Sequence, residues 1–269
     1  MHTPLANLDE TAMENLPEEF ERFTRIQRLQ HWMLVLSFGG LLLTGLPQKF
    51  NEAGLSIRII DVVGGIDNAR LFHRMFAAMF TIESCWHAME IGGAIFKGRF
   101  HPSMFFSFQD FRDLWNMLRY SLGFISQRPQ FDRYDYRQKF EYWGIVFGAL
   151  IMIGTGVALW FPTYVTKWLP GELVPAAKEM HSGEALLAML VIVIWHFYDV
   201  AFSPAVFPLD AGMITGKISR EKLIEEHPLE FARIAASTLH EAGPTSEVVA
   251  SGAAPAPIPR PAAEWQEEA

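Results

Sequence analysis

Five histidines lie within, or at the ends of, otherwise apolar segments of the chain: His31, His73, His87, His181 and His196. A neutral imidazole can bind a metal ion, and ionisable residues in such segments are costly and usually functional. His73 and His87 are 14 residues apart, which on an α-helix places them roughly 40° apart around the axis and about 21 Å apart along it. His181 and His196 are 15 residues apart, roughly 60° around the axis and about 22 Å along it. Each pair therefore offers one imidazole near each end of a helix, on approximately one side.

The segments that carry these histidines are long enough to cross a bilayer. Of the 269 residues, 50% are hydrophobic and 19% are charged, and the ranges 29–48 and 142–166 contain no charged residue. A helix needs about 20 residues to span the hydrocarbon core. We expect four spans, at about residues 29–47, 71–96, 140–162 and 185–202. Three charged residues interrupt the second span: Arg74, Glu83 and Glu90.

The distribution of Lys and Arg predicts the orientation of these spans. Basic residues precede the first span and follow the fourth, and the 97–139 connection carries eight of them, whereas the 48–70 and 163–180 connections carry three and two. With four spans, the basic segments all fall on one face, which the positive-inside rule makes cytoplasmic; three spans would divide them. The sequence therefore predicts an all-α, up-and-down four-helix bundle in the bacterial inner membrane, with both termini in the cytoplasm.

The remaining segments lie outside the predicted bundle. Residues 1–21 form a polar tail before a membrane domain that we place at 22–240. Within the 97–139 connection, aromatic and charged residues alternate as in an amphipathic helix at the cytoplasmic interface; a docking surface for a partner is the alternative. Residues 241–269 are rich in Ala and Pro, which predicts a disordered or partner-bound tail.

Composition excludes several kinds of chemistry. The single cysteine, Cys85, rules out intramolecular disulfides, Cys-ligated iron–sulfur clusters, Cys-rich zinc sites and covalent c-type haem. The net charge of −8 gives no reason to expect nucleic acid as a partner.

Two layers of imidazoles from facing helices suit haem iron held by two histidines. Because spans two and four run in the same direction, His73 would meet His181 at the outer level. At the inner level His196 would meet either His87 or His31. A zinc site needs three or four converging ligands, which the outer level does not offer. Two haems about 20 Å apart would conduct electrons across the hydrocarbon core.

Short stretches along the chain occur in an order and spacing that are together typical of one family. They are Arg28-Leu-Gln-His31-Trp32, Thr44-Gly45, His73-Arg74, Tyr134-Asp-Tyr-Arg-Gln138-Lys139, Thr155-Gly156, Trp160-Phe-Pro162, His181, His196-Phe-Tyr198, Gly216-Lys-Ile-Ser219 and Glu226-His227-Pro228. Over roughly residues 22–235 the chain resembles the bacterial four-helix di-haem cytochrome b family. That family includes the gamma subunit of formate dehydrogenase and the cytochrome b subunit of membrane nickel–iron hydrogenases.

The resemblance implies two haem b groups and their ligands. One haem would be held by His31 and His196, and the other by His73 and His181. It also implies a quinone site beside the cytoplasmic haem, which makes Asp135 and Gln138 candidate contacts for menaquinone or ubiquinone. Asp135 stands where the family has Asn, and its carboxylate could exchange a proton with the quinone.

The chain departs from the family pattern at two further places. The two histidines of span four are 15 residues apart where 14 are expected, so a helix bulge is predicted between them. His87 is an additional histidine. It could compete for the inner haem, hold a third haem, line the quinone pocket, or pack as a hydrogen-bonded residue.

Arginines beside the candidate ligands could pair with haem propionates. They are Arg25, Arg28 and Arg74; for Arg25 and Arg28 an anchoring role at the cytoplasmic surface is the alternative. Glu141 lies near a span end, where solvation is the default interpretation.

These features predict an electron-transferring membrane subunit of a quinone-linked oxidoreductase, without the substrate-specific catalytic chemistry. It would pass electrons between the quinone pool and a periplasmic or membrane-attached partner, either an iron–sulfur protein or a multihaem cytochrome c. The alternatives are a non-redox anchor or assembly subunit with packing histidines, and a transporter with a proton relay.

Overall fold

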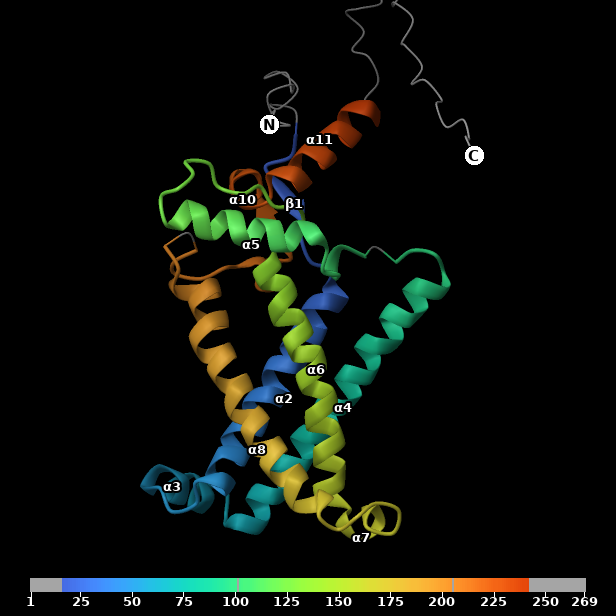
Figure 1. Cartoon of the computed structure of the whole chain (residues 1–269), viewed down its shortest axis with the longest axis vertical. Helices are drawn as coiled ribbons and strands as arrows, with labels where there is room; N and C mark the ends of the chain where they lie inside the picture. The colour runs from blue at the N-terminus through green and yellow to red at the C-terminus, as the bar shows by residue number, and fades with distance from the viewer. Residues whose placement is uncertain (1–15, 101, 205, 242–269) are drawn as a thin grey trace, which may run out of the picture. The chain divides into compact units, whose positions relative to one another are not determined.

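The computed structural model describes residues 16–100, 102–204 and 206–241. The chain divides into two compact units, and one of them, Pro17–Glu230, holds every contact described below. Its long helices are α2 (Arg25–Lys49), α4 (Ile66–Phe96), α6 (Tyr136–Trp160) and α8 (Leu173–Leu190), and α8 continues into η3 (Val191–His196) and η4 (Tyr198–Phe202) (Figure 1). The shorter elements are β1 (Glu19–Glu21), α3 (Gly54–Val62), η2 (Pro102–Met104), α5 (Phe108–Ser121), α7 (Pro162–Val165), α9 (Gly212–Thr215), β2 (Lys217–Ser219), α10 (Arg220–Glu226) and α11 (Pro228–Glu241).

Each long helix begins before the span predicted from apolar composition. Reciprocal capping boxes explain two of these starts: Thr24 with Gln27 at α2, and Asp135 with Gln138 at α6. In a capping box the two side chains satisfy backbone N–H groups that the first helical turn leaves unpaired. Polar residues outside the apolar runs therefore set where these helices begin.

Three helices of the described chain are long and apolar enough to cross a membrane: Arg25–Lys49, Tyr136–Trp160 and Leu173–Phe202. The predicted second span is present as α4, a single helix of 31 residues. Helix α4 is not among the three helices above, because its charged side chains make it less apolar.

The long helices pack as two antiparallel pairs. Contacts between α2 and α4 join Gln30 to Glu90, Gly40 to Phe76 and Thr44 to His73. Contacts between α6 and α8–η3 join Glu141 to His196, Gly148 to Glu184 and Thr155 to His181. In each pair the first residue number rises as the second falls, so the helices run in opposite directions.

The bulge predicted in span four is confirmed. Residues Val191–His196 and Tyr198–Phe202 form π-helix, whose wider turns accommodate extra residues relative to an α-helix. The π-helical turns end η3 on His196 and therefore change the direction in which its side chain points relative to His181.

The all-α prediction is wrong in one detail, because β1 pairs antiparallel with β2, Phe20 opposite Ile218. Gly216, at φ 82°, turns the chain into β2, and its carbonyl accepts hydrogen bonds from the backbone N–H groups of Arg22 and Phe23. The end of the predicted N-terminal tail is therefore a strand. Residues 1–15 of that tail, and residues 242–269 of the predicted C-terminal tail, lie outside the described residues.

Helix α5 presents its two faces in an unusual way. Asp110 and Asp113 are buried, and Asp110 accepts a hydrogen bond of 2.7 Å from Lys139 of α6. The aromatic side chains of Phe108 and Trp115 on the other face are 94% and 61% exposed. The helix thus buries its carboxylates against the protein and exposes its aromatic residues, the reverse of a water-facing surface helix.

A buried ion cluster joins three segments that are distant in the sequence. The Glu230 carboxylate accepts hydrogen bonds from Arg22 (2.6 Å) and Arg133 (2.7 Å). Arg133 also donates to the Arg22 carbonyl at 2.7 Å. His227 donates from Nδ1 to the Asp132 carbonyl (2.7 Å), and its Nε2 accepts from Arg22 (3.1 Å). Both ring nitrogens of the neutral imidazole are therefore satisfied.

The stability of this cluster is expected to fall at acidic pH. Burial lowers the pKa of His227 below its usual value, and the Arg22 guanidinium lowers it further. The unfolded chain then binds a proton that the folded chain excludes, so stability declines as the pH drops below about 6.5. Between pH 7.5 and 5.5 the unfolding free energy should fall by on the order of 1 kcal/mol more in the wild type than in His227→Gln. Denaturant unfolding at the two pH values checks this, and equal losses in both proteins would contradict it.

Candidate functional site

His73 of α4 and His181 of α8 face each other, with ring centroids 6.3 Å apart and planes at 73°. A threonine fixes each ring. Thr44 Oγ1 lies 3.0 Å from Nδ1 of His73, and Thr155 Oγ1 lies 2.9 Å from Nδ1 of His181. The structure therefore brings together the two histidines that the sequence placed at the outer level.

The donors and acceptors around each threonine assign the tautomers of His73 and His181. Each threonine hydroxyl donates to a carbonyl of its own helix, Thr44 to Gly40 O (2.7 Å) and Thr155 to Ile151 O (2.6 Å). Each oxygen is then left to accept from the histidine Nδ1–H, and each Nε2 keeps its lone pair. This is the arrangement in which an outer hydrogen bond orients a metal-binding imidazole.

A glycine follows each of these threonines and gives the ring its space. A Cβ at Gly45 would lie 2.9 Å from Cε1 of His73, and a Cβ at Gly156 would lie 3.4 Å from Cε1 of His181. The same Thr-Gly pair thus forms a matching cradle on α2 and on α6. The sequence pattern contained both pairs but gave no role to the threonines.

His31 of α2 and His196 of η3 form a second facing pair, with ring centroids 6.4 Å apart and planes at 46°. His196 Nδ1 lies 3.1 Å from Oε2 of Glu141, so a carboxylate orients this ring. Glu141 was predicted to be a solvated residue. The structure makes it a partner of His196 instead, because α6 places it beside η3.

Three buried polar atoms at and beside this second pair have no hydrogen-bond partner among the described residues: Arg28 Nε, His31 Nδ1 and Glu141 Oε1. Native proteins leave few such atoms unpaired, and a bound group often accounts for them.

Both histidine pairs fit one metal ion held between two imidazoles. With metal–nitrogen bonds of about 2 Å, two imidazoles on opposite sides of one ion have ring centres roughly 6 Å apart. The measured separations of 6.3 and 6.4 Å match this value. Within the described residues no group of three or more His, Cys, Asp or Glu could hold an ion, so the donor set suits a haem iron and not a zinc site.

His87 belongs to neither pair. Its Nδ1 lies 3.2 Å from Gln30 Oε1, and its Nε2 lies 3.0 Å from the Tyr142 hydroxyl. Of the two inner-level arrangements that the sequence left open, the structure brings His31, and not His87, opposite His196.

Asp135 and Gln138 lie at the start of α6, where their side chains serve its capping box. The Asp135 carboxylate accepts from the backbone N–H groups of Arg137 and Gln138 at 2.9 Å, and Gln138 Oε1 accepts from the Asp135 N–H at 3.2 Å. Asp135 is buried, whereas Gln138 is exposed.

The three candidate propionate arginines are placed differently. Arg28 donates from Nη1 to the Ile214 carbonyl at 2.6 Å and has the unpaired Nε noted above. The Arg74 guanidinium lies 5.4 Å from the ring centroid of Trp160. Arg25 is exposed in the first turn of α2.

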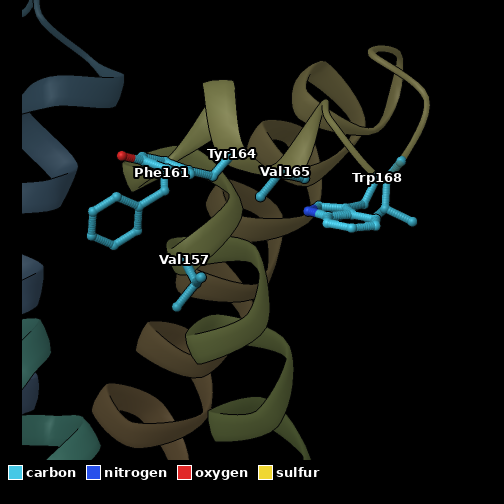
Figure 2. Close-up of a pocket in the computed structure, with 6 residues that line it drawn as sticks. Val157, Phe161, Tyr164, Val165 and Trp168 are labelled. Atoms are coloured by element: carbon cyan, nitrogen blue, oxygen red, sulfur yellow. The ribbon is translucent and has the colours of Figure 1, made fainter.

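A pocket of about 480 Å³ lies at the junction of α6 and α7, and none of its lining residues belongs to either histidine pair (Figure 2). Val157, Phe161, Tyr164, Val165, Trp168 and Leu169 line it. Its lining is apolar apart from the Tyr164 hydroxyl and the Trp168 indole N–H and includes no His, Cys, Asp or Glu, so the histidine pairs are the candidate site.

Comparison with known proteins agrees with this geometry. The family model of the prokaryotic cytochrome b561 matches residues 22–216, and the chain belongs to that family. It is therefore a membrane b-type cytochrome that binds haem b and takes part in electron transfer. Similar proteins include the cytochrome b556(Fdn) subunit of the nitrate-inducible formate dehydrogenase of Escherichia coli K12 and its counterpart in Shigella flexneri. Each is 23% identical over 209 residues, which are 78% of this chain and 88% of the relative.

Proposed function

We propose that the chain is a di-haem subunit that carries electrons across the bacterial inner membrane, between a redox partner at the outer face and quinone near the cytoplasmic face. The observation that carries this proposal is the presence of two histidine pairs with nearly equal ring separations, 6.3 and 6.4 Å, which α8–η3 links by carrying one histidine of each pair, 15 residues apart. Haem b supplies reversible one-electron transfer when it is bound.

In this proposal His73 and His181 hold the outer haem, and His31 and His196 hold the inner haem. Thr44 and Thr155 orient the outer rings, and Glu141 orients His196. A carboxylate partner makes an imidazole a stronger donor than a hydroxyl does, so the two haems are expected to differ in reduction potential. The unpaired Nε of Arg28 is a candidate donor to an inner propionate.

The topology follows from the packing and the distribution of basic residues. We propose that α4, the predicted second span, also crosses the membrane in addition to the three more apolar helices, since it packs along α2 and its charged residues Glu83 and Glu90 lie on the same helix face as His87. Four spans place both termini in the cytoplasm. The exposed aromatic face of α5 then lies in the cytoplasmic interface of the bilayer, where such side chains are stable.

The partner is proposed from the relatives. Their name describes a formate dehydrogenase subunit, which supports assembly of this chain with a larger oxidoreductase through an iron–sulfur protein or a multihaem cytochrome c. The quinone, menaquinone or ubiquinone, would bind near the inner pair. Asp135 and Gln138 stay candidate contacts; both take part in the α6 capping box, and of the two only Gln138 is exposed.

Electron transfer to quinone tests this function directly. Purified full-length protein is reduced with dithionite, excess reductant is removed, and a short-chain quinone is added. We expect the reduced b-type absorption band to disappear as the haem electrons pass to the quinone. Reduced haem that persists in the presence of quinone would contradict the quinone-linked role, and a purified protein without haem would favour a non-redox anchor.

The outer cradle predicts the effect of adding one methyl group. In Gly45→Ala the new Cβ lies 2.9 Å from the His73 ring, which must move. We expect total haem to fall by about half, because disturbing the groups that orient a metal-binding histidine weakens metal binding by roughly 10–100-fold. Gly39→Ala is the matched control on the same helix, since no atom lies within 4 Å of its Cβ. Haem content per chain measures the effect; equal retention in the two variants would show that the cradle does not position His73.

A further inference from the structure

His87 is the centre of a hydrogen-bonded chain that joins three of the long helices. Its Nδ1 contacts Gln30 of α2 at 3.2 Å, and its Nε2 contacts the Tyr142 hydroxyl of α6 at 3.0 Å. Gln30 is buried, and His87 and Tyr142 are half-buried. Polar networks of this kind are expensive among membrane helices and usually have a function.

The chain ends at the protein surface. The Gln30 amide nitrogen donates to Glu90 Oε2 at 2.9 Å, and Glu90 is exposed. A cavity of about 150 Å³ opens beside it, and its polar lining is Gln27, Gln30, His87 and Glu90. Ile91, Ala94 and Phe100 complete the lining. A cavity of this size with several polar groups in its wall has room for water, so water can connect the surface with His87.

The donors and acceptors fix the protonation of the His87 ring. Because the Gln30 amide nitrogen donates to Glu90, the Gln30 carbonyl oxygen must accept from His87 Nδ1–H. The neutral ring then has its lone pair at Nε2, facing the Tyr142 hydroxyl. The Tyr142 hydroxyl can donate a hydrogen bond to that lone pair.

The position of the chain links it to the inner histidine pair. Gln30 directly precedes His31, and Tyr142 directly follows Glu141, the partner of His196. Among the described residues, the charged group beside His87 in the cavity is Glu90 of its own helix, and the facing groups from α2 and α6 are amides and a phenol. Imidazole is the side chain that most readily gains and loses a proton near neutral pH.

We propose that His87 exchanges protons between the cytoplasmic water and the quinone, an inference that rests on the quinone-linked function proposed above. Reduction of a quinone to quinol takes two electrons, which arrive from the inner haem, and two protons. The His87 ring, which lines the cavity, takes up each proton from water there and releases one from Nε2 to a quinone oxygen that takes the place of the Tyr142 hydroxyl, which returns the ring to its neutral form. Quinol oxidation uses the same steps in reverse.

The substitution His87→Gln tests this role, because glutamine can keep hydrogen bonds but cannot carry the proton. The matched control is Ser84→Ala on the same helix, whose hydroxyl only donates to the Phe80 carbonyl. Both purified variants are reduced, and their haems are reoxidised in rapid mixing with short-chain quinone or with ferricyanide, an oxidant that takes no proton. Haem content is measured in parallel.

We expect His87→Gln to keep the wild-type haem content and the wild-type rate with ferricyanide, and to react with quinone at least tenfold more slowly. Added imidazole should restore much of the quinone rate in His87→Ala, and Ser84→Ala should match the wild type throughout. An unchanged quinone rate in His87→Gln would overturn this inference alone. Loss of haem, or equal slowing with both oxidants, would also overturn it by making His87 a ligand or a packing residue. Wild-type haem that quinone does not oxidise would overturn the proposed function and this inference together.

Discussion

Replacing His73 with alanine is expected to remove one of two haems per chain and to leave the other in place. His181 would keep its orienting bond to Thr155, but a single imidazole does not hold the iron as two do. Among the described residues the inner pair shares no hydrogen bond with His73, because His196 bonds to Glu141 and His31 Nδ1 has no partner. A pyridine haemochrome assay, together with the reduced-minus-oxidised spectrum, measures both the number and the identity of the haems that remain.

The pairing makes this prediction more stringent. His181→Ala should give the same residual spectrum as His73→Ala, because either change removes the outer haem. His31→Ala and His196→Ala should share the complementary spectrum. His87→Gln serves as the control that retains both haems. Spectra that group His73 with His196, or a full haem complement in His73→Ala, would contradict the assignment.

Replacing Glu230 with alanine is expected to destabilise the segment that contains β1 and β2 by about 3–5 kcal/mol. The side chain is 4% exposed and pairs with Arg22, which is 5% exposed, and with Arg133. Its loss would leave the guanidinium groups of Arg22 and Arg133 without their shared carboxylate. Removing one partner of a buried ion pair destabilises the fold by more than the intact pair stabilises it. Hydrogen exchange of the backbone amides of β2 reports the local opening free energy.

An exposed ion pair in the same segment provides the control. Lys217 and Glu19 are 58% and 55% exposed, and surface pairs of this kind contribute about 0–1 kcal/mol. Glu19→Ala should therefore change the exchange of β2 far less than Glu230→Ala. Comparable effects of the two substitutions would mean that burial of Glu230 contributes little.

Apolar composition predicted the three helices that are long and apolar enough to span a membrane, because an uncharged run of this length has few alternatives to a helix. It could not predict where they begin. Thr24 and Asp135 cap α2 and α6 from outside the apolar runs. The one-residue excess between His181 and His196 carried more information, since it predicted the π-helical turns of η3; η4 lies beyond His196 and was not predicted.

Helical periodicity placed the histidines at two levels but left the inner partner of His196 open between His31 and His87. Which of the two faces His196 depends on how α2, α4 and η3 are rotated about their axes relative to one another. The residue pattern of a single helix does not determine this rotation. The same limit applies to Thr44, Thr155 and Glu141, whose roles arise from contacts 26 to 55 residues away in the sequence. The β1–β2 pairing was missed because strands of three residues carry almost no periodic signal.

The central claim is that imidazoles from separate helices hold haem iron at two levels, His73 with His181 and His31 with His196. The most direct measurement is the haem b count per chain in the purified full-length protein, by pyridine haemochrome, with electron paramagnetic resonance of the oxidised protein. This account predicts two haem b per chain, both low-spin with two imidazole ligands. A chain with no haem, with a single haem, or with iron bound by one imidazole would contradict it.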